Sequence, residues 1–197
     1  MISDPTRFDA AIAAIDAANA EDPGLDEGQP KELLYGRRMS EMLDRFAPDA
    51  SEAVRLAVRA QHIQRWKTPR SNYPMDRQGY LQWRSGLYRF HADTAAGILQ
   101  AVGYDAETIE QVRAAVGKKG LKVNAGTQLL EDATDLVFLE HYLSGFVAQH
   151  PEYDEAKWIE ILRKTWLKMS EPARRFALAG NISLPESLLP LILKAVA

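Results

Sequence analysis

Apolar residues recur at the three- and four-residue spacing of an α-helix through nearly the whole chain, and no stretch shows the period of two expected of a β-strand. The pattern predicts loops near residues 21–30, 67–76 and 117–126, where Pro, Gly and charged residues gather. It predicts helices near residues 5–20, 31–46, 51–66, 77–102, 105–117 and 127–148, another from Asp154, and a short last helix from Ser183. Since 197 residues suffice for one sizeable core, we expect a single all-α domain over residues 1–197.

Composition removes several classes of function. The chain has no cysteine, which excludes disulfides, thiolate-zinc sites and thiol catalysis. With 24 basic and 27 acidic residues the net charge is −3, which argues against general coating of nucleic acid. The sequence has no apolar run of about 18 residues and no basic start followed by an apolar stretch, so we expect no membrane partner, no signal peptide and a cytoplasmic location.

Positive charge is concentrated in residues 55–89, which hold eight basic residues and one acid, with aromatic residues between them. A solvated basic face that pairs with acidic helices is one interpretation. We favour the other, an anion pocket, because seven of the eight cations are arginine, whose forked guanidinium suits phosphate and carboxylate. The predicted ligand-binding residues are Arg59, Arg65, Trp66, Arg70, Tyr73, Arg77, Lys118 and Lys119. We expect the four arginines to converge on one cleft that also holds His62.

Two histidines are candidates for proton transfer or metal binding. His62 shares a helical stripe with Arg55, Arg59 and Trp66, away from the apolar stripe, which favours a functional face over the core. His91 lies on a mostly apolar stripe, so it is either a hydrogen-bonded core residue or a metal ligand or general base. We expect the two imidazoles to lie close together, with Glu131, Asp132 or Asp135 near both.

Three acids lie within one turn of the predicted central helix: Glu131, Asp132 and Asp135. A carboxylate in a core is costly unless a metal, Arg or Lys compensates it. Either these acids form a surface edge near the helix start, or at least one of them faces the anion pocket or a metal.

Three segments resemble helices of the HD-domain metal phosphohydrolases. They are Leu56–Ile63, which contains Gln61-His62; His91–Leu99, followed by Gly103; and Leu130–Leu136, which contains Asp132. The resemblance covers residues 31–145 and implies an HD-like orthogonal helical bundle with a divalent metal. The chain departs from that family at its metal ligands: Tyr35 stands where the first His is expected, and Gln61-His62 where His-Asp is expected. Thr134 stands where the late Asp is expected, and Asp132 or Asp135 could take the place of that ligand.

Nearly the whole chain also resembles a small family of unknown function, through stretches such as Arg59–Ile63 and Pro69–Arg77. Some members of that family carry a glutamyl-tRNA synthetase label. Here His62-Ile63-Gln64-Arg65 and Lys168-Met169-Ser170 only partly echo the synthetase signatures, and no strands are predicted for a nucleotide-binding α/β domain. The sequence therefore argues against synthetase activity.

The resulting hypothesis is an HD-like hydrolase pocket for a phosphorylated or other anionic small molecule, such as a nucleotide. In this reading His62, His91 and Glu131 are the catalytic residues, and His62, His91 and Asp132 hold a divalent metal ion. The alternative is a non-catalytic, degenerate HD-like module that binds a nucleotide or RNA. Nucleic acid is the less favoured partner.

Overall fold

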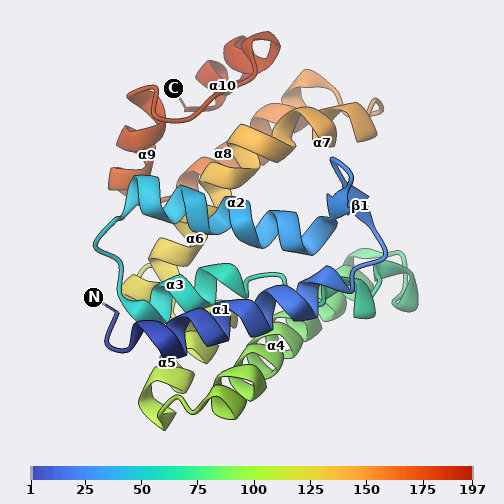
Figure 1. Cartoon of the computed structure of the whole chain (residues 1–197). Coiled ribbons are helices and arrows are strands. Elements are labelled where there is room, and N and C mark those ends of the chain that lie inside the picture. The colour runs from blue at the N-terminus through green and yellow to red at the C-terminus, as the bar shows by residue number, and fades with distance from the viewer. Residues whose placement is uncertain (1, 197) are drawn as a thin grey trace. The chain divides into compact units, whose positions relative to one another are not determined.

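The computed structural model describes residues 2–196, and the chain forms two compact units, one ending at Leu130 and one beginning at Glu131 (Figure 1). The first unit contains α1 (Pro5–Ala20), α2 (Lys31–Phe46), α3 (Glu52–Arg59), α4 (Arg77–Val102) and α5 (Ala106–Val116). Helix α6 (Ala125–Val137) continues from the first unit into the second. The second unit adds a π-helical turn (Phe138–Tyr142), α7 (Leu143–Gln149), α8 (Glu155–Lys168), α9 (Glu171–Leu178) and α10 (Leu189–Val196). The predicted all-α class is confirmed.

Side-chain caps explain where most of these helices begin. Asp4 accepts a hydrogen bond from the backbone N–H of Arg7, and Ser51, Asp105 and Asp154 cap α3, α5 and α8 in the same way. A capping oxygen satisfies one of the backbone donors that a helix start leaves without a partner. These four starts agree with the sequence prediction.

In the first unit α4 packs against α5, and α3 lies between α5 and α2. Helix α1 contacts α2, α3 and α4, as Figure 1 shows by its course across them. The core of this unit includes Ile15, Met39, Leu56 and Leu99, none of which is more than 1% exposed.

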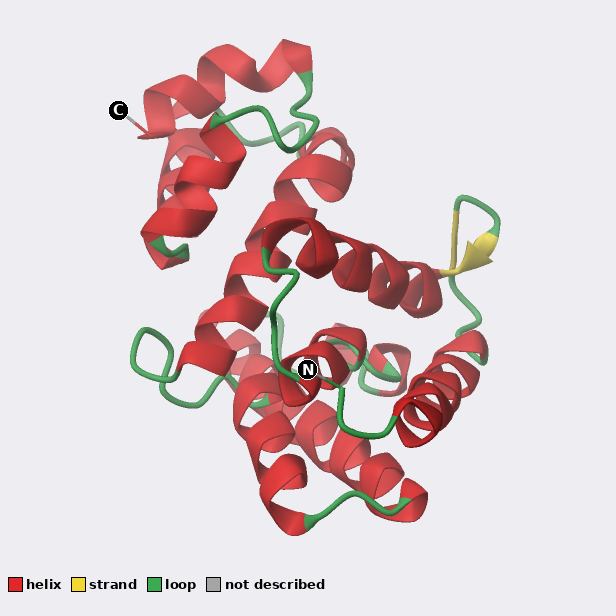
Figure 2. Ribbon diagram, turned by 60° about the vertical axis from the view of Figure 1, so that its left-hand side comes forward, coloured by secondary structure: helices red, strands yellow, loops and turns green. Residues whose placement is uncertain are grey.

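A small hairpin occupies part of the predicted loop at residues 21–30. Strand β1 (Leu25–Asp26) pairs antiparallel with β2 (Gln29–Pro30), and Figure 2 shows this pair in yellow among the red helices. Glu27 and Gly28 both have positive φ, as a two-residue type I′ turn requires. The prediction missed the hairpin because two-residue strands are too short to show periodicity.

The helix predicted at residues 51–66 ends early, at Arg59. The chain turns over residues 60–64 and continues as a short 3₁₀ helix at Arg65–Lys67, with Gln64 in the left-handed region at φ 52°. The side chain of Asn19, buried in α1, accepts a hydrogen bond from the Gln64 backbone N–H at 2.9 Å. This tertiary contact replaces the helical hydrogen bond, so His62 lies on a turn rather than on the predicted helical stripe.

The second unit contains a helix that the sequence analysis missed. Helix α9 begins at Glu171, where the Ser170 side chain accepts from the Ala173 N–H, and Pro172 follows in the first turn. Helix α8 packs against α10 in the same unit. The predicted helix at residues 127–148 contains a π-helical turn at Phe138–Tyr142 between α6 and α7. Over the described residues, no helix combines the length and apolar character needed to cross a bilayer.

Candidate functional site

The start of α2 places Glu32 in the interior of the first unit. Pro30 stands at the N-cap and offers no side-chain hydrogen bond, and Asp22 replaces that cap by accepting from the Glu32 N–H at 3.1 Å. A second oxygen of Asp22 accepts from the Gly24 N–H, which fixes the preceding turn. The Glu32 side chain is only 6% exposed. The loop before α2 therefore determines where this carboxyl lies.

The turn after α3 brings His62 to Glu32. The His62 Nδ1 atom lies 3.5 Å from a Glu32 carboxyl oxygen, and the Tyr35 ring stacks on the imidazole with centroids 4.2 Å apart. An Arg65 guanidinium nitrogen lies 3.3 Å from His62 Nε2. Since arginine can only donate, Nε2 carries the lone pair of the neutral imidazole and Nδ1–H faces Glu32. A quarter of the His62 side chain is exposed, so solvent reaches this group.

Helix α4 supplies the second histidine. The His91 ring centroid lies 5.9 Å from that of His62, so the expected closeness of the two imidazoles is observed. The His91 Nδ1 atom lies 2.8 Å from the carbonyl oxygen of Ile63, which makes Nδ1 the donor and Nε2 the acceptor. Among the described residues, the buried Nε2 atom has no hydrogen-bond partner. We refer to Glu32, Tyr35, His62, Arg65 and His91 as the His62 cluster.

Burial shifts the protonation of three groups in the cluster, Glu32, His62 and His91. It raises the pKa of Glu32 to about 7, against the opposing effects of Arg65, Lys31 and His91. Burial, helped by the charges of Arg65, Lys118 and Lys31, holds the pKa of His62 well below its usual range. Burial also lowers the pKa of His91 to about 3. Near neutral pH both histidines are therefore neutral, and Glu32 is the group that gains or loses a proton.

Cations surround this neutral pair of histidines. Arg65 is held between His62 and the Trp83 ring, whose centroid lies 5.0 Å from its guanidinium carbon. Lys31, the first residue of α2, and Lys118, in the loop after α5, both act electrostatically on His62. The cluster therefore combines positive charge, which attracts an anion, with a carboxyl group that titrates near neutral pH.

The predicted arginines do not all reach this cluster. Arg65 does, whereas Arg59 makes two 2.6 Å contacts with the carboxylate of Asp16 in α1. Arg70 donates to the backbone carbonyls of Tyr73 and Asp76 and so holds its own loop together. The expected convergence of four arginines on His62 is therefore corrected. The Arg59 guanidinium pairs with Asp16, and the Arg70 guanidinium binds carbonyl oxygens of its own loop.

The other predicted ligand-binding residues are spread over the first unit. Arg77 is exposed at the first position of α4, Trp66 is half-buried in the 3₁₀ turn, and the half-buried Tyr73 follows the Arg70–Asn72 turn. Lys119 lies 3.4 Å from Glu110 and lines a cavity of about 430 Å³ between α4 and α5 with Arg89 and Arg113, among others. Their roles in ligand binding stay predictions.

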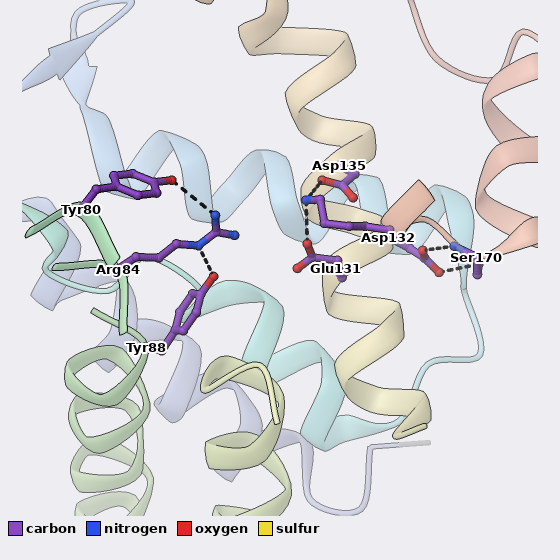
Figure 3. Close-up of polar contacts among 8 residues, drawn as sticks. Tyr80, Arg84, Tyr88, Glu131, Asp132, Asp135 and Ser170 are labelled. Atoms are coloured by element: carbon purple, nitrogen blue, oxygen red, sulfur yellow. Dashed lines mark hydrogen bonds and ion pairs between the residues drawn. The ribbon is translucent and has the colours of Figure 1, made fainter. Parts of the chain in front are cut away.

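The three acids of α6 have structural partners within the second unit (Figure 3). The Lys168 ammonium lies 2.8 Å from Glu131 and 2.9 Å from Asp135. Asp132 accepts from both the backbone N–H and the hydroxyl of Ser170, which is itself the cap of α9. A lysine thus provides the compensation that the sequence analysis expected of a metal, Arg or Lys. The predicted catalytic role of Glu131 stays a prediction.

The described residues do not fit the divalent metal that the HD resemblance implies. No group of three or more His, Asp or Glu side chains among residues 2–196 has an arrangement that could hold a metal ion. At two positions where the HD pattern has metal ligands, this chain has Tyr35, which stacks on His62, and Gln61, whose side chain is buried. The arrangement of the described residues therefore gives no support to His62, His91 and Asp132 as metal ligands.

Glu32 was not predicted from the sequence, although its pKa of about 7 makes it the group of the cluster that titrates near neutral pH. An acid in the first turn of a helix usually complements the helix dipole at the surface, and nothing in Lys31-Glu32-Leu33-Leu34 distinguishes Glu32 from that case. The signal available was the three-residue spacing from Glu32 to Tyr35, which puts both on one face of α2.

A search of curated proteins and a search of solved structures each found no match to this chain. A family model does match: Domain of unknown function (DUF4202), over residues 9–192. That match spans both units and every residue of the His62 cluster. The chain therefore belongs to the DUF4202 family.

Proposed function

We propose that the His62 cluster binds a phosphorylated small molecule or nucleotide and hydrolyses it, within a helical bundle of HD-like order. The observation that carries this proposal is the buried Glu32 carboxyl, with a pKa of about 7, at 3.5 Å from His62 Nδ1. Because this pKa lies near neutral pH, the Glu32 carboxylate is available from about pH 7 upward to stabilise a protonated His62. The positive charges of Arg65, Lys31 and Lys118 provide the attraction for the phosphate.

The geometry suggests how the groups act together. An incoming phosphate competes for the Arg65 guanidinium, and this frees the His62 Nε2 lone pair that Arg65 now contacts. His62 Nε2 then takes the proton of the water that attacks phosphorus, as the bond from phosphorus to the leaving oxygen breaks and its electron pair stays on that oxygen. The imidazolium afterwards gives its proton to the leaving oxygen. The Glu32 carboxylate faces Nδ1–H and stabilises the imidazolium that forms. Its place resembles the third member of a catalytic triad, which orients and stabilises the base.

We expect His62→Ala to reduce the rate of phosphate release by about 10²–10⁴-fold, the usual contribution of a positioned acid or base. The assay measures phosphate released from nucleotides, sugar phosphates and pyrophosphate, with His150→Ala in the second unit as the matched histidine control. Because the carboxylate form of Glu32 is the active one, kcat/KM should rise with pH through about 7 and then level off.

Activity that is equal in wild type and His62→Ala would contradict the proposal. Elemental analysis of the untagged protein accompanies the assay, since one metal ion per chain would restore the predicted metal role.

The second candidate is a non-catalytic module that binds a nucleotide. Tyr35 and Gln61 stand where the HD pattern has metal ligands, and this replacement favours binding without turnover. Ligand binding that depends on Arg65, with no phosphate released from any compound, would support this alternative over the hydrolase.

A further inference from the structure

Residues 65–90, which we call the basic arm, carry positive charge that the rest of the chain compensates only at Lys67, whose ammonium lies 4.0 Å from the Glu21 carboxylate. Five arginines of the arm have no carboxylate partner among the described residues: Arg65, Arg70, Arg77, Arg84 and Arg89. By contrast, the arginines on either side of the arm each pair with an acid, Arg55 with Asp44, Arg59 with Asp16 and Arg113 with Asp93. The arm is therefore not the ion-paired basic face considered in the sequence analysis.

The single acid of the arm does not neutralise it. The Asp76 carboxylate accepts a 2.7 Å hydrogen bond from the Gly79 N–H and caps α4. Arg70 donates to two loop carbonyls, and the Trp83 indole N–H donates to the Thr68 carbonyl, so the loop before α4 has a fixed shape. The arm thus presents its charge from an ordered loop and a helix.

Arg84 is held in place by two tyrosines on the same face of α4 (Figure 3). Its Nε–H donates to the Tyr88 hydroxyl, one turn later, and a terminal N–H donates to the Tyr80 hydroxyl, one turn earlier. These bonds use two of the five guanidinium N–H groups, and three remain for a ligand. A cation that is already oriented loses little side-chain entropy when it binds.

The first part of α4 is largely open to solvent. Of residues 77–86 only Gly79 is buried, while Tyr80 is 41% and Leu81 is 55% exposed. Arg77, Arg84 and Tyr88 follow one another at helical spacing along one side, over about 16 Å of helix. This surface alternates planar cations with aromatic rings.

We propose that the basic arm binds single-stranded nucleic acid. Arg77 and Arg84 contact the phosphates, and the Tyr80 ring stacks on a base. Arg89, about 140° farther round α4 than Arg84, adds electrostatic attraction for the strand. A charged groove or stripe combined with aromatic rings is how proteins hold single strands without reading their sequence. An acidic protein would complement the charge and would leave the rings without a specific role. A single strand also has free base faces, which a duplex lacks.

The test measures fluorescence anisotropy of labelled oligo-uridine and oligo-thymidine of about 12 nucleotides, within the usual range of single-strand sites. The variant Arg77→Gln/Arg84→Gln/Arg89→Gln should bind about 100-fold more weakly at about 0.1 M salt, and its plot of log K against log salt should be shallower by about 2. The control removes three exposed cations of the second unit, as Lys157→Gln/Lys164→Gln/Arg175→Gln, and should bind as wild type does.

A tyrosine pair separates stacking from charge. Tyr80→Leu should weaken binding about tenfold through lost stacking, while Tyr80→Phe, which keeps the ring, should stay close to wild type. Circular dichroism verifies that each variant is folded. The proposal is overturned if wild type does not bind either oligonucleotide or if the triple arginine variant binds as the control does. It is also overturned if poly-glutamate displaces the strand as well as unlabelled oligonucleotide does, which would identify an acidic protein as the partner.

Discussion

Replacing Lys168 with methionine should lower the free energy of unfolding by about 2 kcal/mol, less than the ~3–5 kcal/mol typical of a fully buried ion pair, because the Lys168 side chain is 34% exposed. The Lys168 ammonium lies within 2.9 Å of both Glu131 and Asp135, whose side chains are 6% and 4% exposed. Methionine fills a similar volume without the charge, so the two acids of α6 then remain buried without this cation. Urea unfolding followed by circular dichroism measures the change.

The matched control for this variant is Lys164→Met, on the same helix. Lys164 is 70% exposed and pairs with Glu160 at the surface, so its loss should cost less than about 1 kcal/mol. A loss in Lys168→Met no larger than in the control would show that Lys168 does not provide the compensation that these acids need.

Glu32→Gln should make the protein more stable than wild type at about pH 8, by about 3 kcal/mol, and should leave its stability nearly unchanged at about pH 4. The folded-state pKa of Glu32 is about 7, against 4.5 for an ordinary glutamate. Between these two values the folded state binds more protons than the unfolded state, so the stability that Glu32 contributes is present below 4.5 and is lost as pH rises to 7. Glutamine keeps the shape of the side chain and has no proton to lose.

The comparison must be made within the same pH series, because His91 has the opposite effect. Its pKa falls from 6.5 to about 3 in the folded state, so the stability it contributes is present above 6.5 and lost as pH falls. Most of that loss is common to wild type and Glu32→Gln and cancels in the difference, because Glu32 is the smallest of the effects on the His91 pKa. Glu160→Gln, at an exposed position, is the control and should show no such gain at about pH 8. Equal stability of wild type and Glu32→Gln across the series would mean that Glu32 titrates as an ordinary glutamate.

Local sequence accounts for much of the fold. Asp4, Ser51, Asp105 and Asp154 mark helix starts because a capping side chain acts on residues two or three positions ahead. The same rule identifies α9, since Ser170-Glu171-Pro172 combines a cap, a first-turn acid and an early proline.

The features that could not be predicted depend on contacts between distant residues. The early end of α3 follows from Asn19, which is 45 residues away from the Gln64 amide it binds. Arg59 is drawn away from His62 by Asp16, 43 residues earlier in the chain. Helical spacing alone put Arg59 and His62 on one stripe, because it carries no information about partners on another helix.

The candidate site was predicted only in part, because it too depends on contacts between distant residues. The order of helices was enough to expect His62 and His91 to lie together, and their rings are 5.9 Å apart. The pKa of Glu32 depends on how deeply the packed helices bury it, which no local pattern records. Arg65, three residues after His62, contacts it at 3.3 Å across the turn that follows α3.

We propose above all that an anion binds at the His62 cluster, next to Glu32. Isothermal titration calorimetry with pyrophosphate at about pH 7, run in two buffers of different ionisation enthalpy, tests it by measuring both affinity and proton uptake. An anion beside Glu32 raises the pKa of that carboxyl further, so binding should take up part of a proton.

We expect binding with proton uptake in wild type, binding without uptake in Glu32→Gln, and affinity at least about tenfold lower in Arg65→Gln, because a charged hydrogen bond is lost. Equal affinity in wild type and Arg65→Gln, together with equal proton uptake in wild type and Glu32→Gln, would show that the anion does not bind at the His62 cluster.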